Sequence, residues 1–315
     1  MIPPLYFPLS SPQYDLRIGA SPLPAGQLIF EPDEHFTHEL ALKRHCLDFN
    51  PHYDCQSLPG SEAAQAELAR LLGLSEGGIR AAGDSVQEDL LLLDLSQPGL
   101  PLIAGHLCFA NAWCLDDKIG RPFLSIHAPV PDFENTIGPS SQKLIERLKP
   151  GRPISRLNWA VKSTGQLDLT SRWDAFVASC NAAITPQNAG THCWMRAERQ
   201  TLCLLPQSNT ALFTVHTYTQ PVSTLTPAQA VDMLGNLKAF ISDLTKQEEA
   251  LKARLISTGA LEIDGDQFRC TVSQTDRVSL DTAKLREVLP DFIVKECEKV
   301  TTVTMVRVSA RKRAA

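Results

Sequence analysis

The stretch from Leu102 to Pro131 constrains the fold of this chain more than any other, because it joins an apolar run to a proline-flanked histidine. Its first residues, LIAGHLCFA, have the apolar character of a buried strand. Its end, Ile-His-Ala-Pro-Val-Pro, places Pro129 and Pro131 directly after His127. Because proline fixes φ, we expect an extended backbone there, and an imidazole held in one position at the end of an apolar strand.

The segments around this stretch predict an antiparallel sheet with flanking helices. Strand-like apolar segments occur at 86–95, 100–110, 156–163, 192–206 and 211–222. Turn signals at 96–99 and 206–209 join two pairs of these segments as hairpins. Helical periodicity marks 32–49, 61–74 and 139–148. The first thirty residues are rich in proline and predict an extended arm. The predicted fold class is therefore α+β.

The composition changes near residue 222, which predicts two domains at 1–221 and 222–315. All eight histidines, all four tryptophans and 20 of the 22 prolines precede this point. The first part carries 16 basic and 22 acidic side chains, and the second carries 14 and 13. The second part predicts a long helix from Thr226 to about Ser257, then a small helix–hairpin–helix–strand unit.

The apolar side chains of this long helix form a narrow stripe of the coiled-coil type. The stripe consists of Val231, Leu234, Leu237, Ile241, Leu244, Leu251 and Leu255. It favours self-association into a homo-oligomer, but a helix packed back onto its own sheet would show the same pattern.

Charge and cysteine usage exclude several classes of function. A net charge of −5 gives no electrostatic support for nucleic acid as a partner. No apolar run approaches the twenty or so residues of a membrane helix, and the N-terminus has no basic, signal-like start. The nine cysteines are scattered without a C-x-x-C pair, so we expect reduced thiols and a cytoplasmic location, not disulfides or a zinc site. We see no hydrolase triad order or phosphate-binding glycine loop.

One predicted strand carries charges that its apolar surroundings make costly to bury. Period-two alternation puts Arg196, Glu198 and Gln200 on one face and Arg199 and Thr201 on the other. Such charges require pairing or a ligand. A bound anionic or amine-bearing partner would supply the ligand, and an internal Arg196–Glu198–Arg199 ion network is the alternative.

Six motifs, taken together and in this order, carry a family resemblance. They are VQEDLLLLDL, AGHLCFANAW, KIGRPFLSIHAPVP, RLNW, RAERQTLCLLP and FTVHTY. With them, residues from roughly 20 to 221 resemble the haem-dependent oxidative N-demethylase family, typified by the α subunit of dimethylamine monooxygenase. The resemblance implies a PAS-like domain in which haem b binds O₂ and oxidises a methyl group of a small secondary amine such as dimethylamine. The products would be formaldehyde and the shorter amine, with electrons from NADPH through FMN and [2Fe-2S] centres on partner reductase chains.

Haem iron requires an axial ligand, and its propionates require basic partners. His127 is the predicted metal ligand, and a core histidine bonded to backbone is the alternative. We expect His106 to be a packed histidine, and we place the thiols of Cys108 and Cys114 behind His127 because apolar surroundings raise a thiol pKa. The cofactor-contacting residues that we expect beside His127 are Lys118, Arg121, Arg156, Trp159 and Arg196.

On the substrate side we expect Glu198 as a counter-charge for the protonated amine, with Tyr218 and Trp159 as walls. His216 stands where the family commonly carries a basic residue, usually arginine. It would tune substrate choice or proton delivery, or mark lost activity. From about Leu225 the chain departs from the family and resembles small bacteriophage proteins of unassigned role.

Two non-enzymatic hypotheses remain beside the monooxygenase. One is a PAS-type haem sensor whose long helix transmits the signal. The other is a decayed enzyme module that acts as an oligomerising scaffold.

Overall fold

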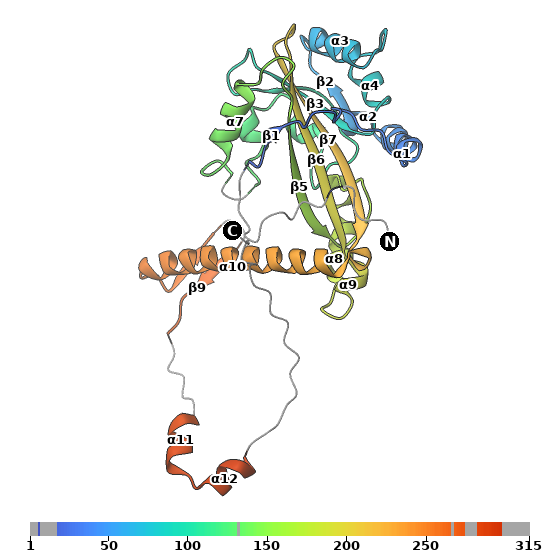
Figure 1. The fold of residues 1–315 in the computed structure, drawn as a ribbon. Helices are drawn as coiled ribbons and strands as arrows, with labels where there is room; N and C mark the ends of the chain where they lie inside the picture. The colour runs from blue at the N-terminus through green and yellow to red at the C-terminus, as the bar shows by residue number, and fades with distance from the viewer. Residues whose placement is uncertain (1–5, 7–17, 131–132, 266–267, 275–281, 298–315) are drawn as a thin grey trace. The chain divides into compact units, whose positions relative to one another are not determined.

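The computed structural model describes residues 6, 18–130, 133–265, 268–274 and 282–297 (Figure 1). The chain forms two compact units, of which the first ends at Ala230 and the second begins at Val231. Within the described residues, no helix has both the length and the apolar character needed to cross a membrane.

A seven-stranded antiparallel sheet in the order β1-β5-β6-β7-β3-β4-β2 organises the first unit. The strands are β1 (Ser21–Pro22), β2 (Cys55–Ser57), β3 (Asp89–Asp94), β4 (Leu102–His106), β5 (Ile154–Lys162), β6 (Trp194–Leu205) and β7 (Thr210–Pro221). Both predicted hairpins, β3–β4 and β6–β7, are present. The α+β prediction is confirmed.

Each face of the sheet has its own apolar core, which explains why β3 is a run of four leucines. Leu90 and Leu92 pack with residues of α3 (Glu62–Leu71) and α4 (Gly78–Gly83). Leu91 and Leu93 pack on the other side with Phe123 of α6 (Phe123–Ile126) and Ile145 of α7 (Gly138–Glu146). We call these sides the α3–α4 face and the α6–α7 face. A strand between two cores must be apolar on both of its faces.

Short helices and turns complete this unit. They are α1 (Phe36–Phe49), α2 (Pro51–Asp54), α5 (Leu115–Lys118), α8 (Asp174–Ala182) and α9 (Ala189–His192), with 3₁₀ turns at Ser171–Trp173 and Val222–Thr224. The predicted helices at 32–49, 61–74 and 139–148 correspond to α1, α3 and α7, each somewhat shorter than expected.

The long helix α10 (Pro227–Ser257) begins where the sequence predicted. Thr226 and Gln229 form reciprocal hydrogen bonds: the Thr226 amide donates to Oε1 of Gln229 (2.9 Å), and the Gln229 amide donates to the Thr226 hydroxyl (3.3 Å). This is a capping box, which satisfies amides that the first helical turn leaves unpaired.

The second unit contains a small hairpin and two helices. The hairpin pairs β8 (Glu262–Asp264) with β9 (Arg269–Thr271), and the helices are α11 (Thr282–Val288) and α12 (Asp291–Glu296). The hairpin and both helices were predicted. The predicted final strand, at 301–310, lies outside the described residues.

The expected conformation after His127 is wrong. His127 follows the short helix α6 with φ −96° and ψ 2°, and the Val130 amide donates to the His127 carbonyl at 2.8 Å. The chain therefore turns at this histidine, which does not end a strand. The fixed φ of proline suits a turn as well as an extended segment, and the sequence alone does not distinguish the two. Pro131 lies outside the described residues.

Candidate functional site

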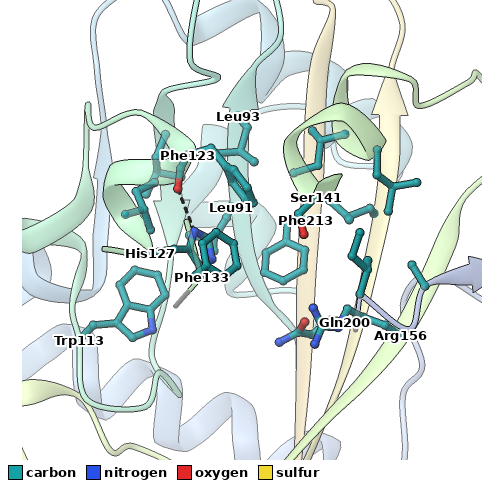
Figure 2. A pocket seen from close by; sticks show the side chains of 17 residues that line it. Leu91, Leu93, Trp113, Phe123, His127, Phe133, Ser141, Arg156, Gln200 and Phe213 are labelled. Atoms are coloured by element: carbon teal, nitrogen blue, oxygen red, sulfur yellow. Dashed lines mark hydrogen bonds between the residues drawn. The ribbon is translucent and has the colours of Figure 1, made fainter. Parts of the chain in front are cut away.

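A pocket lies between the sheet and the α6–α7 region, on the α6–α7 face (Figure 2). About 810 Å³ of space is free of atoms there, including the part that opens to solvent. Its walls are Ile18, Ala20, Leu91, Leu93, Leu102, Trp113, Phe123, Ile126, His127, Phe133, Ser141, Leu144, Ile145, Arg156, Gln200, Leu202 and Phe213. Mostly apolar walls with a few convergent polar groups are typical of a cofactor or small-molecule site.

His127 is one of these polar groups, and its ring is held from two sides. Nδ1 lies 2.8 Å from the backbone carbonyl oxygen of Phe123. The ring stacks on Phe133 with centroids 4.4 Å apart and an interplanar angle of 13°, and Phe123 packs against it at 4.6 Å. These contacts fix both the position and the rotation of the imidazole, as the sequence predicted, although a turn and two rings provide the restraint.

The hydrogen bond also determines which nitrogen of His127 is available. A carbonyl oxygen can only accept, so Nδ1 carries the hydrogen and the neutral ring keeps its lone pair on Nε2. No described residue hydrogen-bonds Nε2. Burial lowers the pKa of His127, against a smaller opposing effect of the Phe123 carbonyl, which favours the neutral ring. A neutral imidazole whose Nδ1–H is bound to a carbonyl is the usual form of a metal-ligating histidine.

Arg156 lies across the pocket from His127, beside Gln200 (Figure 2). It comes from β5, where Gln200 of β6 is its cross-strand partner. Its Nε is buried without a hydrogen-bond partner, and burial lowers its pKa, against a partial opposing effect of Glu198. Among the described residues, the pocket walls contain no carboxylate. A buried guanidinium nitrogen without a partner is costly, so this corner of the pocket suits an anionic group.

The residues of the pocket fit a haem group. His127 presents a free nitrogen for iron, the aromatic and aliphatic walls suit a flat macrocycle, and Arg156 suits a carboxylate. This fit uses two of the residues predicted to contact the cofactor.

Lys118 and Arg121, also predicted to contact the cofactor, are not among the pocket walls. Lys118 donates to the carbonyl oxygen of Ile126 at 2.7 Å, at the end of α6. Arg121 is exposed. Lys118 therefore fixes the helix that carries Phe123 and precedes His127, and its role is one of positioning.

Arg196 is bonded mainly to protein partners and is not among the pocket walls, contrary to its predicted role as a cofactor contact. Its guanidinium donates to the carbonyl oxygens of Leu167 (2.9 Å) and Phe109, to the hydroxyl of Thr217 (3.3 Å) and to Glu198 (3.2 Å). Its side chain is 1% exposed. These bonds tie β6 to two loops and use four of the five N–H groups of the guanidinium.

A sequence model of one protein family matches residues 72–255, and it is described as haem-dependent oxidative N-demethylase, alpha subunit-like. This match covers more than half of the chain. The chain belongs to this family. The match includes the strands of the pocket, His127, Arg156 and most of α10, so the expected departure from the family at about Leu225 is wrong.

The three residues predicted to bind the substrate of this haem-dependent oxidative N-demethylase family member lie on two different faces of the sheet. Glu198 lies on the α6–α7 face, where it accepts from Arg196, Asn158 and Gln200. Tyr218 and Trp159 lie on the α3–α4 face, because both are cross-strand neighbours of Ala197. The expectation that the three form one site is wrong. Ala197 and Glu198 are adjacent in β6, and adjacent residues of a strand point to opposite faces.

His216 also lies on the α3–α4 face, 1% exposed and away from the pocket. Its Nδ1 is 3.3 Å from Glu88, and its Nε2 is 3.8 Å from both Asp33 and Glu39. Tyr218 stacks on its ring at 4.3 Å, and burial raises the pKa of the tyrosine. His216 is thus the centre of an acidic cluster and not a member of the pocket, contrary to its predicted catalytic placement.

The predicted ion network of Arg196, Glu198 and Arg199 is correct for its first pair only. Arg199 points to the α3–α4 face, where its Nε is 3.4 Å from Glu31. The alternation along β6 was predicted correctly, but Glu31 as the partner was not, because it comes from a distant segment.

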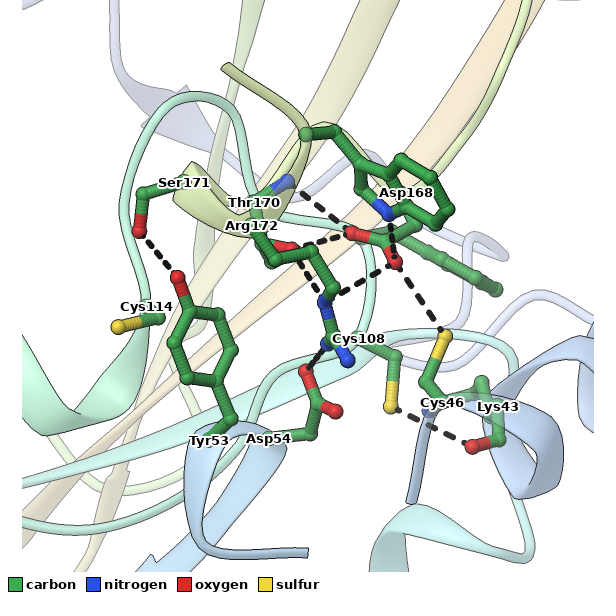
Figure 3. A network of polar contacts seen from close by, with 12 residues as sticks. Lys43, Cys46, Tyr53, Asp54, Cys108, Cys114, Asp168, Thr170, Ser171 and Arg172 are labelled. Atoms are coloured by element: carbon green, nitrogen blue, oxygen red, sulfur yellow. Dashed lines mark hydrogen bonds and ion pairs between the residues drawn. The ribbon is translucent and has the colours of Figure 1, made fainter. Parts of the chain in front are cut away.

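The two cysteines considered as alternative iron ligands are not among the pocket walls. Figure 3 shows both of them beside a network of polar contacts. Sγ of Cys108 lies 3.8 Å from the carbonyl oxygen of Lys43, and burial raises the pKa of its thiol well above the usual value. Burial also raises the pKa of Cys114. Both sulfurs are therefore thiols in this fold and poor ligands.

His106 at the end of β4, Asp89 at the start of β3 and Cys108 bring three potential metal-ligating groups together. Each oxygen of Asp89 already accepts a backbone amide, from Cys108 (2.8 Å) and from Phe109 (2.9 Å). The buried ammonium of Lys43, held by carbonyls of 83–88, opposes the charge of Asp89 and would repel a cation. Burial lowers the pKa of His106 to about 4, so it is a neutral packed histidine, as predicted.

Sequence reasoning missed several pocket residues. Trp113, Phe133 and Gln200 line the pocket, and only the folded chain brings Trp113 and Gln200 close to His127. The aromatic residues on both sides of His127 in the sequence, Phe123 and Phe133, were the available signal.

Proposed function

We propose that this chain binds haem in the pocket of the α6–α7 face and takes part in the oxidative N-demethylation of a small secondary amine. The observation that carries the proposal is the free Nε2 of His127, whose Nδ1 hydrogen is fixed on the Phe123 carbonyl in an apolar pocket. The family match supports the same activity.

Haem, when bound, would supply the activation of O₂ for oxidation of the N-methyl group. In balanced form, the amine, O₂, two electrons and two protons give the demethylated amine, formaldehyde and water. His127 would hold the iron, and Phe123 and Phe133 would keep its ring at a fixed orientation. Arg156 would pair with a propionate carboxylate. The leucine and phenylalanine walls would exclude water.

Glu198 is our proposal for the counter-charge of the amine. It lies on the face of the pocket but behind Gln200, which donates to it at 3.0 Å. Through this hydrogen bond the charge of Glu198 would polarise the amide of Gln200, which lies in the pocket wall.

We propose that the electrons come from partner chains. This sequence carries no nicotinamide fingerprint and no ferredoxin-type cysteine pattern, and the family description of an alpha subunit suits a multi-subunit enzyme. NADPH, FMN and [2Fe-2S] centres on a reductase are the donors that the family resemblance implies.

The deciding experiment is an absorption spectrum of the purified chain before and after addition of haemin, with His127→Ala alongside. We expect a Soret band in the native chain and its loss or shift in the variant. His38→Ala, at an exposed histidine of α1, is the matched control and should behave as the native chain. An identical spectrum for native and His127→Ala protein would contradict the assignment.

A non-catalytic haem sensor is the second candidate, because α10 follows the sheet almost directly, beginning at Pro227 after β7 ends at Pro221. Amine turnover with a supplied electron donor separates the two. Haem binding without turnover of any secondary amine would favour the sensor.

A further inference from the structure

Residues 18–33 run between two different regions of the first unit. Ile18 and Ala20 are pocket walls. The next residues form β1, in which Ser21 pairs with Ser155, the neighbour of Arg156 in β5. The segment thus passes from the pocket along the edge of the sheet.

The far end of this segment is fixed on the opposite face. Arg199 donates to the carbonyl oxygens of Ile29 (3.2 Å) and Leu28, and its Nε is 3.4 Å from Glu31. The Glu31 amide donates to Glu88 at 2.8 Å, and Tyr6 donates its hydroxyl to Glu31 at 2.5 Å. Arg199 is 2% exposed, so this is a buried, charge-assisted attachment.

A second attachment follows two residues later. Asp33 exchanges two hydrogen bonds with Gln87, at 2.9 and 2.8 Å, and the Gln87 amide also donates to Glu39 of α1 at 2.8 Å. Asp33 and Glu39 both face His216. We call this group of contacts, centred on Arg199, Glu31 and Asp33, the anchor.

Between the pocket and the anchor the segment is weakly held. None of its residues from 18 to 29 is buried. Its attachments to the sheet there are the β1 pairing and the bond from the Leu23 amide to the Pro153 carbonyl (2.9 Å). Gly19 and Gly26 have φ of 61° and 85°, a region that favours glycine, and they flank β1 as two pivots. Exposed segments with few buried contacts open at low free energy.

We propose that residues 18–33 are a strap that closes the pocket, and that its attachment at the anchor, on the opposite face of the sheet, sets the rate at which molecules reach His127. Such a strap would control the entry of any ligand that the pocket binds. Its role in catalysis rests on the proposed haem function, whereas its position over the pocket does not.

The test measures the rate at which diethyl pyrocarbonate modifies Nε2 of His127 in the haem-free full chain, followed by peptide mass spectrometry. Glu31→Gln keeps the shape of the side chain but removes its charge, so the anchor weakens. We expect modification of His127 to become about tenfold faster, the size of effect that one lost charge-assisted hydrogen bond predicts. Exposed His38 and His45 serve as internal controls and should keep their rates.

Glu34→Gln is the matched control variant, because Glu34 directly follows the strap and is 76% exposed, with His35 as its ion-pair partner. It should leave the rate at His127 unchanged. Equal rates for native, Glu31→Gln and Glu34→Gln proteins would overturn the proposal, since the anchor would then have no effect on the pocket.

A disulfide between Ser21→Cys and Ser155→Cys, which are cross-strand partners, locks the strap without touching the anchor. We expect the oxidised form to slow modification of His127 and to cancel the effect of Glu31→Gln, and reduction to restore both. Unchanged rates in the locked protein would overturn the proposal. Haemin capture by the same variants then shows whether haem follows the same route, and a failure there alone would count against the haem function and not against the strap.

Discussion

The chemistry of this chain depends on how each buried polar residue is satisfied. Arg196 has protein partners in four directions, whereas Nε of Arg156 has none. Both are arginines on the same face of neighbouring strands, and the sequence alone does not distinguish them. Arg156 is the one that suits a ligand, because a buried donor without a partner costs free energy until something binds.

His106 leads to a prediction at this scale. Its pKa is lowered from 6.5 to about 4, first by burial and then by the charge of Lys43. The unfolded chain therefore binds this proton at a higher pH than the native protein does. The stabilisation from the neutral ring is present above pH 6.5 and is lost as the pH falls toward 4, on the order of 3 kcal/mol.

His106→Gln removes this dependence. We expect the variant to be less stable than the native protein at pH 8, through lost packing, and the difference to shrink as the pH falls to 4. Urea unfolding at each pH measures it. Asp54, whose pKa burial raises to about 6 and which is not part of the His106 cluster, changes stability in the opposite direction in both proteins and cancels in the difference. A gap that stays constant with pH would contradict the prediction.

At the scale of elements, the period of a pattern is readable from the sequence but the register between strands is not. Alternation along β6 correctly separated Glu198 from Arg199. Whether Tyr218 joins Glu198 depends on the pairing of β6 with β7, and Glu198 lies opposite Thr217. The predicted substrate site failed at this step, because a shift of one residue exchanges the faces of a whole strand.

The other errors concern segments far apart in the chain. The sheet, its two hairpins and the main helices followed from local patterns, whereas the turn that holds His127 did not. The pairing of Arg199 with Glu31 and of His216 with Glu88 did not, because only the folded chain brings these residues together. Apolar periodicity determines which side of an element is buried, and leaves open what it is buried against.

Arg196→Met tests the structural role that we assign to the bonds of β6. Removing the guanidinium leaves the Glu198 carboxylate without its ion-pair partner and two loop carbonyls without donors, which should destabilise the first unit by about 3 kcal/mol. Chemical denaturation measures this, and the exposed Arg121→Met is the control. If the variant instead kept its stability and lost only haem affinity, Arg196 would be a cofactor contact after all.

At the scale of the whole molecule, the open question is what the apolar stripe of α10 contacts. Leu244 and Leu251 are 45% and 61% exposed. We expect self-association through this stripe, because three turns of exposed leucine and isoleucine at heptad spacing are stabilised by a second copy. Lys252, paired with Glu248 (2.7 Å) and Glu249 (3.2 Å), holds part of the polar side of the helix.

Light scattering on the full chain tests this expectation. The native protein should be larger than a monomer, and Leu244→Glu with Leu251→Glu should reduce it to one, with the Soret band after haemin addition unchanged. Lys246→Glu, on a polar and exposed position of the same helix, controls for charge alone. A native chain that is monomeric at every concentration would favour the alternative that the stripe packs against the protein's own sheet. In that case the two substitutions should lower the melting temperature of the monomer. If the native protein is an oligomer, they should instead lower the molecular mass measured by light scattering.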